Sequence, residues 1–156
     1  MTAILTSSRR EAPRATGVEA LARLVGTWRI WCRGAEGLWG GSAEGVVTYE
    51  WTDGGDALVE RVDLRSDGAA IRSVKIIGNG PSGGGEPARG IRARHDAGET
   101  LDLVYEIDCD TLTVRADGDD SPAHYRAVFS TDGTTLTGRW VHPGAGSDDG
   151  TAVRIT

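Results

Sequence analysis

Apolar and polar residues alternate along short segments from residue 26 onward, and a period of two is typical of half-buried β-strands. Glycine, together with Asp, Ser or Asn, separates the segments, as tight hairpin turns require. No helical segment of ~10 residues lies between them, which argues against an alternating α/β fold. The pattern predicts strands over residues 26–34, 44–52, 56–66, 70–79, 88–95, 99–107, 111–116, 123–130, 134–141 and 150–155.

Most turns between these segments are short, so consecutive strands are expected to be antiparallel neighbours in an up-and-down order. A meander of this length either closes on itself or leaves an exposed edge. We therefore expect an all-β fold, namely a closed or nearly closed antiparallel barrel of about 8–10 strands. For residues 70–79 the alternation does not decide which face points inward, because Lys75 shares a face with Ile71 and Ile77.

A short helix is expected before the first strand. Thr16 and Glu19 fit a capping box, in which each side chain bonds to the backbone of the first turn. Apolar residues then follow at helical spacing, and Gly26 stands where a helix commonly ends. The helix should cover about nine residues, 17–25, and plug one end of the barrel.

Composition narrows the partners and the compartment. The net charge is −6, and the basic residues, of which only Lys75 is a lysine, are scattered, so a nucleic-acid partner is not expected. No apolar run approaches the ~20 residues of a membrane span, and no secretory signal is visible, so we expect a cytoplasmic protein without a membrane partner. Cys32 and Cys109 are too few for a disulfide framework and show no metal-ligand spacing. We expect one domain over residues 16–156, preceded by a disordered basic arm of residues 1–15, and a monomer or homodimer.

The more apolar face of each strand should point into the barrel. The candidates for ligand contact on these faces are Tyr49, Trp51, Leu58, Val62, Leu103, Tyr125, Phe129 and Trp140. Three polar residues on the same faces are candidate catalytic groups: Glu60, His95 and Tyr105. Burying a bare carboxylate is costly, so Glu60 either pairs with an arginine near a rim or meets a ligand. His95 stands beside Asp96 at a strand end, so it either caps a turn or belongs to the site.

Two motifs near the ends of the predicted barrel carry a resemblance to a known superfamily. Residues 24–28 read LVGTW at the start of the first strand, and Arg154 ends the last strand. Residues 129–140 read F-S-x-D-G-x-x-L-x-G-x-W. Over residues 20–155 the chain resembles lipocalin-like (calycin) barrels, in particular small single-domain bacterial barrels with an L-x-G-x-W start. The resemblance implies that Trp28 plugs one end with Arg154 packed over it, and that the barrel encloses a small-molecule cavity.

The resemblance and the predicted interior together favour a binding protein for a small, mostly apolar or aromatic molecule, such as a polyketide-like compound, without a cofactor. The alternative is a cofactor-independent cyclase or isomerase of biosynthesis, with Glu60 as acid/base and Tyr49 or Tyr105 as donor to a developing oxyanion. The third hypothesis is a small interaction module or a barrel whose interior is packed solid. Haem-binding nitrobindins have a similar opening and are a lesser alternative, although no matching histidine motif is present. We also expect the glycine-rich residues 80–87 to form the most mobile loop, at the open mouth.

Overall fold

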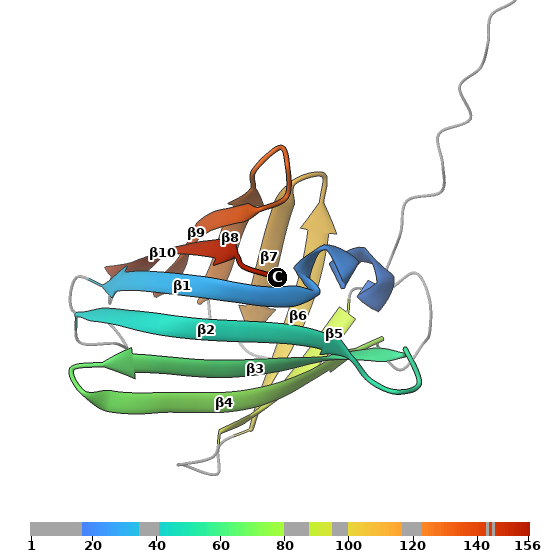
Figure 1. The fold of residues 1–156 in the computed structure, drawn as a ribbon, viewed down its shortest axis with the longest axis horizontal. Coiled ribbons are helices and arrows are strands. Elements are labelled where there is room, and N and C mark those ends of the chain that lie inside the picture. The colour runs from blue at the N-terminus through green and yellow to red at the C-terminus, as the bar shows by residue number, and fades with distance from the viewer. Residues whose placement is uncertain are drawn as a thin grey trace, which may run out of the picture.

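The computed structural model describes residues 17–34, 41–79, 88–94, 100–116, 123–142, 144 and 146–156. In this part of the chain a short helix is followed by ten strands (Figure 1). The elements are η1 (Gly17–Leu24), β1 (Gly26–Gly34), β2 (Ser42–Trp51), β3 (Ala57–Ser66), β4 (Ala69–Gly78), β5 (Ala88–Arg94), β6 (Thr100–Asp108), β7 (Thr111–Ala116), β8 (His124–Phe129), β9 (Thr135–His142) and β10 (Gly146–Arg154). The predicted arm, His95 and the predicted mobile loop of residues 80–87 lie outside the described residues.

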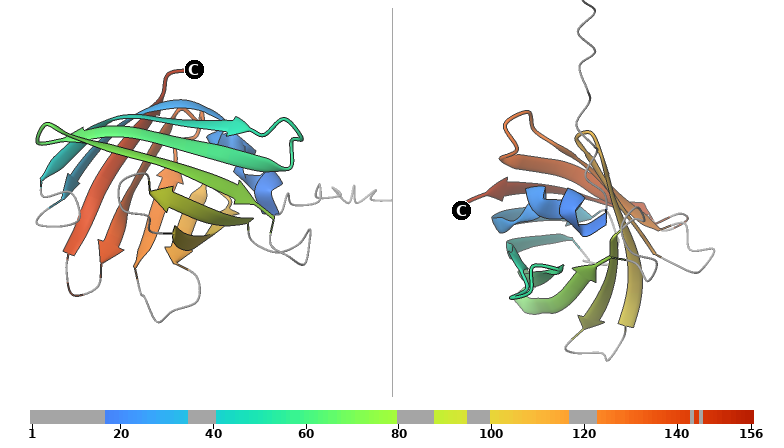
Figure 2. Two further views of the ribbon diagram at one scale, coloured as in Figure 1. Left: turned by 90° about the horizontal axis from the view of Figure 1, so that it is seen from below. Right: turned by 90° about the vertical axis from the view of Figure 1, so that its right-hand side faces the viewer.

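The strands form one closed antiparallel barrel. Each strand pairs with its neighbours in the sequence, and β1 pairs with both β2 and β10, which closes the sheet. The right-hand view of Figure 2 looks at one end of the barrel, with η1 lying across it. The prediction of a closed up-and-down barrel with a helix at one end is confirmed.

The last strand is longer than predicted. β10 begins at Gly146, four residues before the predicted start, and Asp148 pairs with Trp140 of β9 and with Gly34 of β1. Ser, Asp and Gly have low β propensity, so their run in the sequence indicated a turn. Backbone pairing with a strand on each side outweighs that propensity.

The structure also decides which face of β4 points inward. Ser73, Lys75 and Ile77 are 3%, 8% and 0% exposed, whereas Ile76 is 56% exposed. The inward face is therefore the one that carries the lysine. A charged group points into this barrel and an apolar side chain points out of it.

Helix η1 is a 3-10 helix that covers one end of the barrel. Its three apolar residues Val18, Leu21 and Leu24 are buried to 2% exposure or less. A 3-10 helix has three residues per turn, so residues at this spacing lie in a single row. That row packs against the strands and forms part of the core. No helix in the described residues has the length and apolar character needed to cross a membrane.

The predicted stack of Trp28 and Arg154 is present at the same end. These residues face each other across the β1–β10 pairing, and the Cζ atom of Arg154 lies 4.3 Å from the ring centroid of Trp28. The Arg154 guanidinium also donates to the carbonyl oxygens of Arg23 and Val25 at the end of η1. The indole nitrogen of Trp28 donates to the carbonyl oxygen of Leu24 over 2.8 Å. Arg154 therefore joins the final strand to the helix that closes the barrel.

A second arginine fixes η1 on its other side. Arg23 donates to the carbonyl oxygen of Cys109 over 2.8 Å and forms an ion pair with Asp110 over 3.0 Å, both in the β6–β7 turn. Its Cζ atom lies 4.2 Å from the ring centroid of Phe129. The helix is thus bound to strands on both sides of the barrel.

The motif of residues 129–140 forms the β8–β9 turn and its flanks. The Asp132 carboxylate accepts hydrogen bonds from Ser130 Oγ over 2.8 Å, from Thr134 Oγ1 over 2.7 Å and from Thr134 N over 3.1 Å. These bonds, those from Thr134 first, lower the pKa of Asp132 to about 2. The Ser and Asp of the motif thus set the geometry of the turn.

Two glycines of the motifs stand where a side chain has no room. A Cβ atom on Gly138 would lie 2.3 Å from the carbonyl oxygen of Arg126 on the neighbouring strand. A Cβ atom on Gly26 would lie 2.4 Å from the carbonyl oxygen of Thr156, and Gly26 has φ of +131°. Both glycines permit a close approach of two backbones.

Candidate functional site

The barrel encloses a cavity of about 160 Å³. Five of the described aromatic residues contribute to its wall, namely Trp28, Tyr49, Tyr105, Tyr125 and Trp140. Aliphatic side chains fill much of the rest, and Leu24 of η1 bounds it at the closed end. The barrel is therefore not packed solid, because it holds a mostly aromatic chamber that contains a few polar groups.

The main polar cluster of the chamber spans three adjacent strands. Tyr49 of β2, Glu60 of β3 and Lys75 of β4 are successive partners in the strand register. The ammonium of Lys75 lies 2.8 Å from Oε1 of Glu60, and both side chains are less than a tenth exposed. The Tyr49 hydroxyl is hydrogen-bonded to Glu60 as well. The carboxylate is thus held by a cation and a phenol.

Two further groups surround Lys75. Its Nζ atom lies 5.3 Å from the ring centroid of Tyr105, a cation–π distance. Ser73, two residues away on the same inward face, is 3% exposed. Among the described residues, none accepts from or donates to the Ser73 hydroxyl. A buried hydroxyl that bonds no protein group is suited to contact a molecule in the chamber.

A second polar cluster lines the cavity beside a pair of aromatic rings. The rings of Tyr125 and Trp140 pack with centroids 5.6 Å apart. Asp148, the register partner of Trp140, is buried to 3% exposure, and Cys32 lines the cavity with it. The chamber therefore has a carboxylate in each of its two polar clusters.

Burial and the carboxylates determine the protonation of the neighbouring groups. Burial, followed by the charge of Glu60, raises the pKa of Tyr49 well above its usual range. Burial also raises the pKa of Tyr125, with smaller contributions from Cys32 and Glu60. Burial and then the Asp148 carboxylate raise the pKa of Cys32. At neutral pH these phenols and this thiol keep their protons and can donate hydrogen bonds.

The structure brings six of the predicted site residues to the cavity, and they are Tyr49, Glu60, Val62, Tyr105, Tyr125 and Trp140. Leu58, Leu103 and Phe129 are buried in the surrounding core and do not line it. Trp51, which was expected to contact the ligand, stands at the end of β2, is 37% exposed and does not line the cavity. Its register partner Leu58 is 0% exposed, so Trp51 lies on the predicted face of β2 but at the end of the strand.

Reasoning from the sequence missed several cavity residues, among them Cys32, Ser73, Lys75 and Asp148. Ser73 and Lys75 lie on the strand whose inward face the sequence did not decide. Asp148 lies in the part of β10 for which the sequence predicts a turn. Counting back by two from the apolar Ala152 places it on the inward face. Cys32 lies on the inward face of β1 with Trp28 and Ile30. Counting forward by two from Trp28 also places it there.

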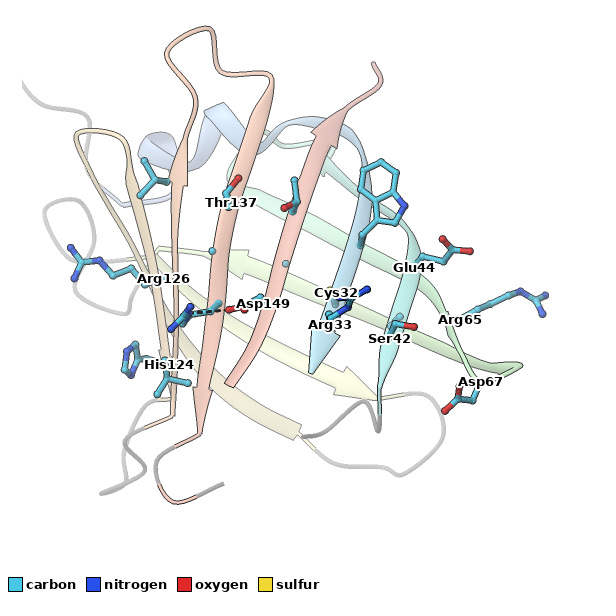
Figure 3. Close-up of a pocket in the computed structure, with 18 of the residues that line it drawn as sticks. Cys32, Arg33, Ser42, Glu44, Arg65, Asp67, His124, Arg126, Thr137 and Asp149 are labelled. Carbon is cyan, nitrogen blue, oxygen red and sulfur yellow. Dashed lines mark ion pairs between the residues drawn. The ribbon is translucent and has the colours of Figure 1, made fainter. Parts of the chain in front are cut away.

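A larger hollow of about 1110 Å³ lies on the outer wall, over β8, β9, β10, β1 and β2 (Figure 3). Its lining includes outward-facing charged side chains such as Arg33, Arg126 and Arg139. Arg139 Nε lies 3.0 Å from Oδ1 of Asp149, and both side chains are more than half exposed. The buried charges and aromatic walls belong to the inner chamber, which is therefore the stronger candidate site.

In the part of the chain that the structure describes, no three His, Cys, Asp or Glu side chains are grouped to hold a metal ion. The sequence matches no model of a protein family and no curated protein. The barrel and the groups inside its chamber are therefore the features that point to a function.

Proposed function

We propose that this protein is a lipocalin-like (calycin) binding protein, whose chamber holds one compact aromatic molecule with a polar substituent. The observation that carries the proposal is a chamber with aromatic walls inside the closed barrel, into which Lys75, Glu60 and Tyr49 converge. Ligand sites are mostly apolar, with a few placed polar groups that fix orientation. Aromatic walls suit a flat ring, and the polar cluster suits its substituent.

The volume limits the size of the ligand. An apolar cavity of about 150 Å³ accommodates benzene, so a chamber of about 160 Å³ suits a single substituted ring. A polyketide-like compound with several rings would exceed that volume. The proposal therefore narrows the expected ligand class to single-ring molecules.

Haem fits the chamber poorly. The macrocycle needs far more volume than a single ring, and no described histidine lines the cavity. Haem is therefore not the ligand we propose. Cys32 and Cys109 form no disulfide bond, as is usual for cysteines in a reducing compartment, and we include a cytoplasmic location in the proposal.

Calorimetric titration with single-ring alcohols, phenols and amides tests the binding function. We expect Val62→Phe, which puts a ring into the chamber, to weaken binding ~tenfold or more, a loss of about 1.4 kcal/mol. Val59→Phe is the matched control, because Val59 lies on the outer face of the same strand. Equal affinities for both variants, or no binding of any single-ring compound, would refute the proposal.

A cofactor-independent isomerase or cyclase is the second candidate. It is favoured by the position of Glu60, a buried carboxylate in contact with Lys75 and Tyr49 inside the chamber. Such a group can take a proton from one ligand atom and return it to another. Glu60→Gln should abolish turnover per folded molecule while a bound product analogue is retained. Unchanged turnover in this variant would exclude Glu60 as the acid/base group.

A further inference from the structure

The only lysine of the chain lies inside the barrel. The sequence contains 17 basic residues, and all except Lys75 are arginines. Lys75 is 8% exposed and lines the chamber. We propose that Lys75 captures a carbonyl compound, an aromatic aldehyde or ketone, as a protonated imine. This inference rests on the proposed binding function and names the class of its ligand.

The difference between the two cationic side chains supports this assignment. Arginine stays protonated, is always charged, and is the residue usually chosen for buried ion pairs. Lysine can lose its proton when buried and then becomes a nucleophile for carbonyl groups. If the position only needed a partner for Glu60, arginine would serve, and this chain uses arginine everywhere else. Among the residues whose burial the structure describes, the one buried cationic position thus carries a lysine, which indicates amine chemistry.

The surroundings of Lys75 supply what the reaction needs. Glu60, 2.8 Å from Nζ, can take the proton that makes the amine nucleophilic. The Ser73 hydroxyl, buried on the same inward face, can donate to the carbonyl oxygen of the ligand. The ring of Tyr105, 5.3 Å from Nζ, can pack against an aromatic ligand and the cation that forms.

The step balances without any further reactant. The ammonium of Lys75 gives a proton to Glu60, and the free amine attacks the carbonyl carbon to form an N–C bond. A proton passes from nitrogen to the former carbonyl oxygen, which gives a neutral carbinolamine. Glu60 returns its proton to the hydroxyl, the C–O bond breaks, and water leaves. The product is a protonated imine, so nitrogen keeps its positive charge and Glu60 remains its counter-ion.

Reductive trapping tests the inference. The full chain is incubated with benzaldehyde and cyanoborohydride, with Nα-acetyl-lysine amide in the same solution as a reference amine. Peptide mapping by mass spectrometry should find the benzyl group on Lys75. Capture at Lys75 should be at least ~tenfold faster than at the reference amine, because the chamber positions the aldehyde. Slower capture at Lys75 than at the reference amine would overturn the inference.

Two controls separate this inference from the binding function. Lys75→Arg keeps the charge beside Glu60 but cannot form an imine, so the reaction with benzaldehyde and cyanoborohydride should leave no label at residue 75. Benzyl alcohol has the same ring and no carbonyl group, so its binding reports the chamber alone. Binding of benzyl alcohol to the wild-type chain without labelling of Lys75 refutes imine capture and leaves the binding function standing. Failure of both compounds to bind refutes the binding function, and the inference with it.

Discussion

At the scale of single residues, the pair of Glu60 and Lys75 dominates the interior. Two opposite charges less than a tenth exposed lie 2.8 Å apart inside an aromatic chamber. Taking two ions out of water costs several kcal/mol each, and their attraction offsets that cost only when both are present. Removing one of the two charges should therefore destabilise the fold far more than removing both.

This sensitivity gives a stability prediction. Lys75→Met should lower the free energy of unfolding by ~3–5 kcal/mol, because it leaves the Glu60 carboxylate buried without its cation. The double variant Glu60→Leu with Lys75→Met should recover most of the loss. Guanidinium denaturation of the wild-type chain and both variants measures this. Additive losses in the double variant would show that the two charges do not depend on each other.

The two cysteines provide a second prediction at this scale. Cys109 is exposed, whereas burial and the Asp148 carboxylate raise the pKa of Cys32. The thiolate is the reactive form, so iodoacetamide at pH 8 should modify Cys109 first. Asp148→Asn should speed the modification of Cys32, whereas Asp149→Asn, one residue away on the outer face, should not. A timed alkylation followed by mass spectrometry measures both rates. Equal rates of Cys32 modification in the two variants would contradict the effect assigned to the Asp148 carboxylate.

At the scale of elements, two arginines attach the closing helix to the barrel. Arg154 comes from the last strand to the end of η1, and Arg23 reaches from η1 to the β6–β7 turn. A row of three buried apolar side chains fixes the face of η1 that meets the barrel. The end of the barrel is thus closed by packing and by charged hydrogen bonds together.

Truncation of the indole should open this end. Trp28→Ala should lower the free energy of unfolding by ~3–5 kcal/mol, as other truncations of large aromatic side chains in protein cores do. Arg154→Lys should cost less, since it keeps the charge but loses the planar stack and one of two carbonyl contacts. Thermal unfolding followed by circular dichroism ranks the two variants. A larger loss for Arg154→Lys than for Trp28→Ala would contradict this ranking.

The elements also show how far the sequence alone could lead. Alternation and turn residues predicted the order of the strands, because these signals are local. Closure was predicted because a meander of this length otherwise leaves an exposed edge. The start of β10 was wrong, because its pairing partners lie in distant strands and outweigh the turn-like composition of residues 146–149. The inward face of β4 could not be decided from the sequence. Lys75 lowers the hydrophobicity of the face that it shares with Ile71 and Ile77, so neither face is clearly the more apolar. The missed cavity residues Ser73, Lys75 and Asp148 all follow from these two failures.

At the scale of the whole molecule, the chamber should make the fold sensitive to alkali. The pKa values of Tyr49 and Tyr125 are raised by burial in the folded chain, whereas in the unfolded chain they are near 10. The folded state therefore holds more protons than the unfolded state above pH ~10. The stability that these protonated phenols contribute is fully present below pH ~10. It is lost as the pH rises toward the pKa values that the two tyrosines have in the folded chain.

Urea denaturation between pH 8 and pH 11 tests this dependence. Unfolding free energy should fall above pH ~10 in the wild-type chain. The fall should be smaller when Tyr49 and Tyr125 are both replaced by Phe, which has no proton to lose. An unchanged slope in the double variant would assign the alkaline loss to other groups.

The pairing of β1 with β10 has a consequence for how the chain folds. The hydrogen bond from Arg154 to Val25 joins residues 129 positions apart, and contacts so distant in the sequence slow folding. During synthesis, β1 waits with an unpaired edge until β10 has left the ribosome, and such an edge is a template for pairing with other chains. A chain that stops at residue 145 should therefore aggregate in light scattering where the full chain does not. We therefore expect closure to be the last event of folding, with the first strand in need of protection until then.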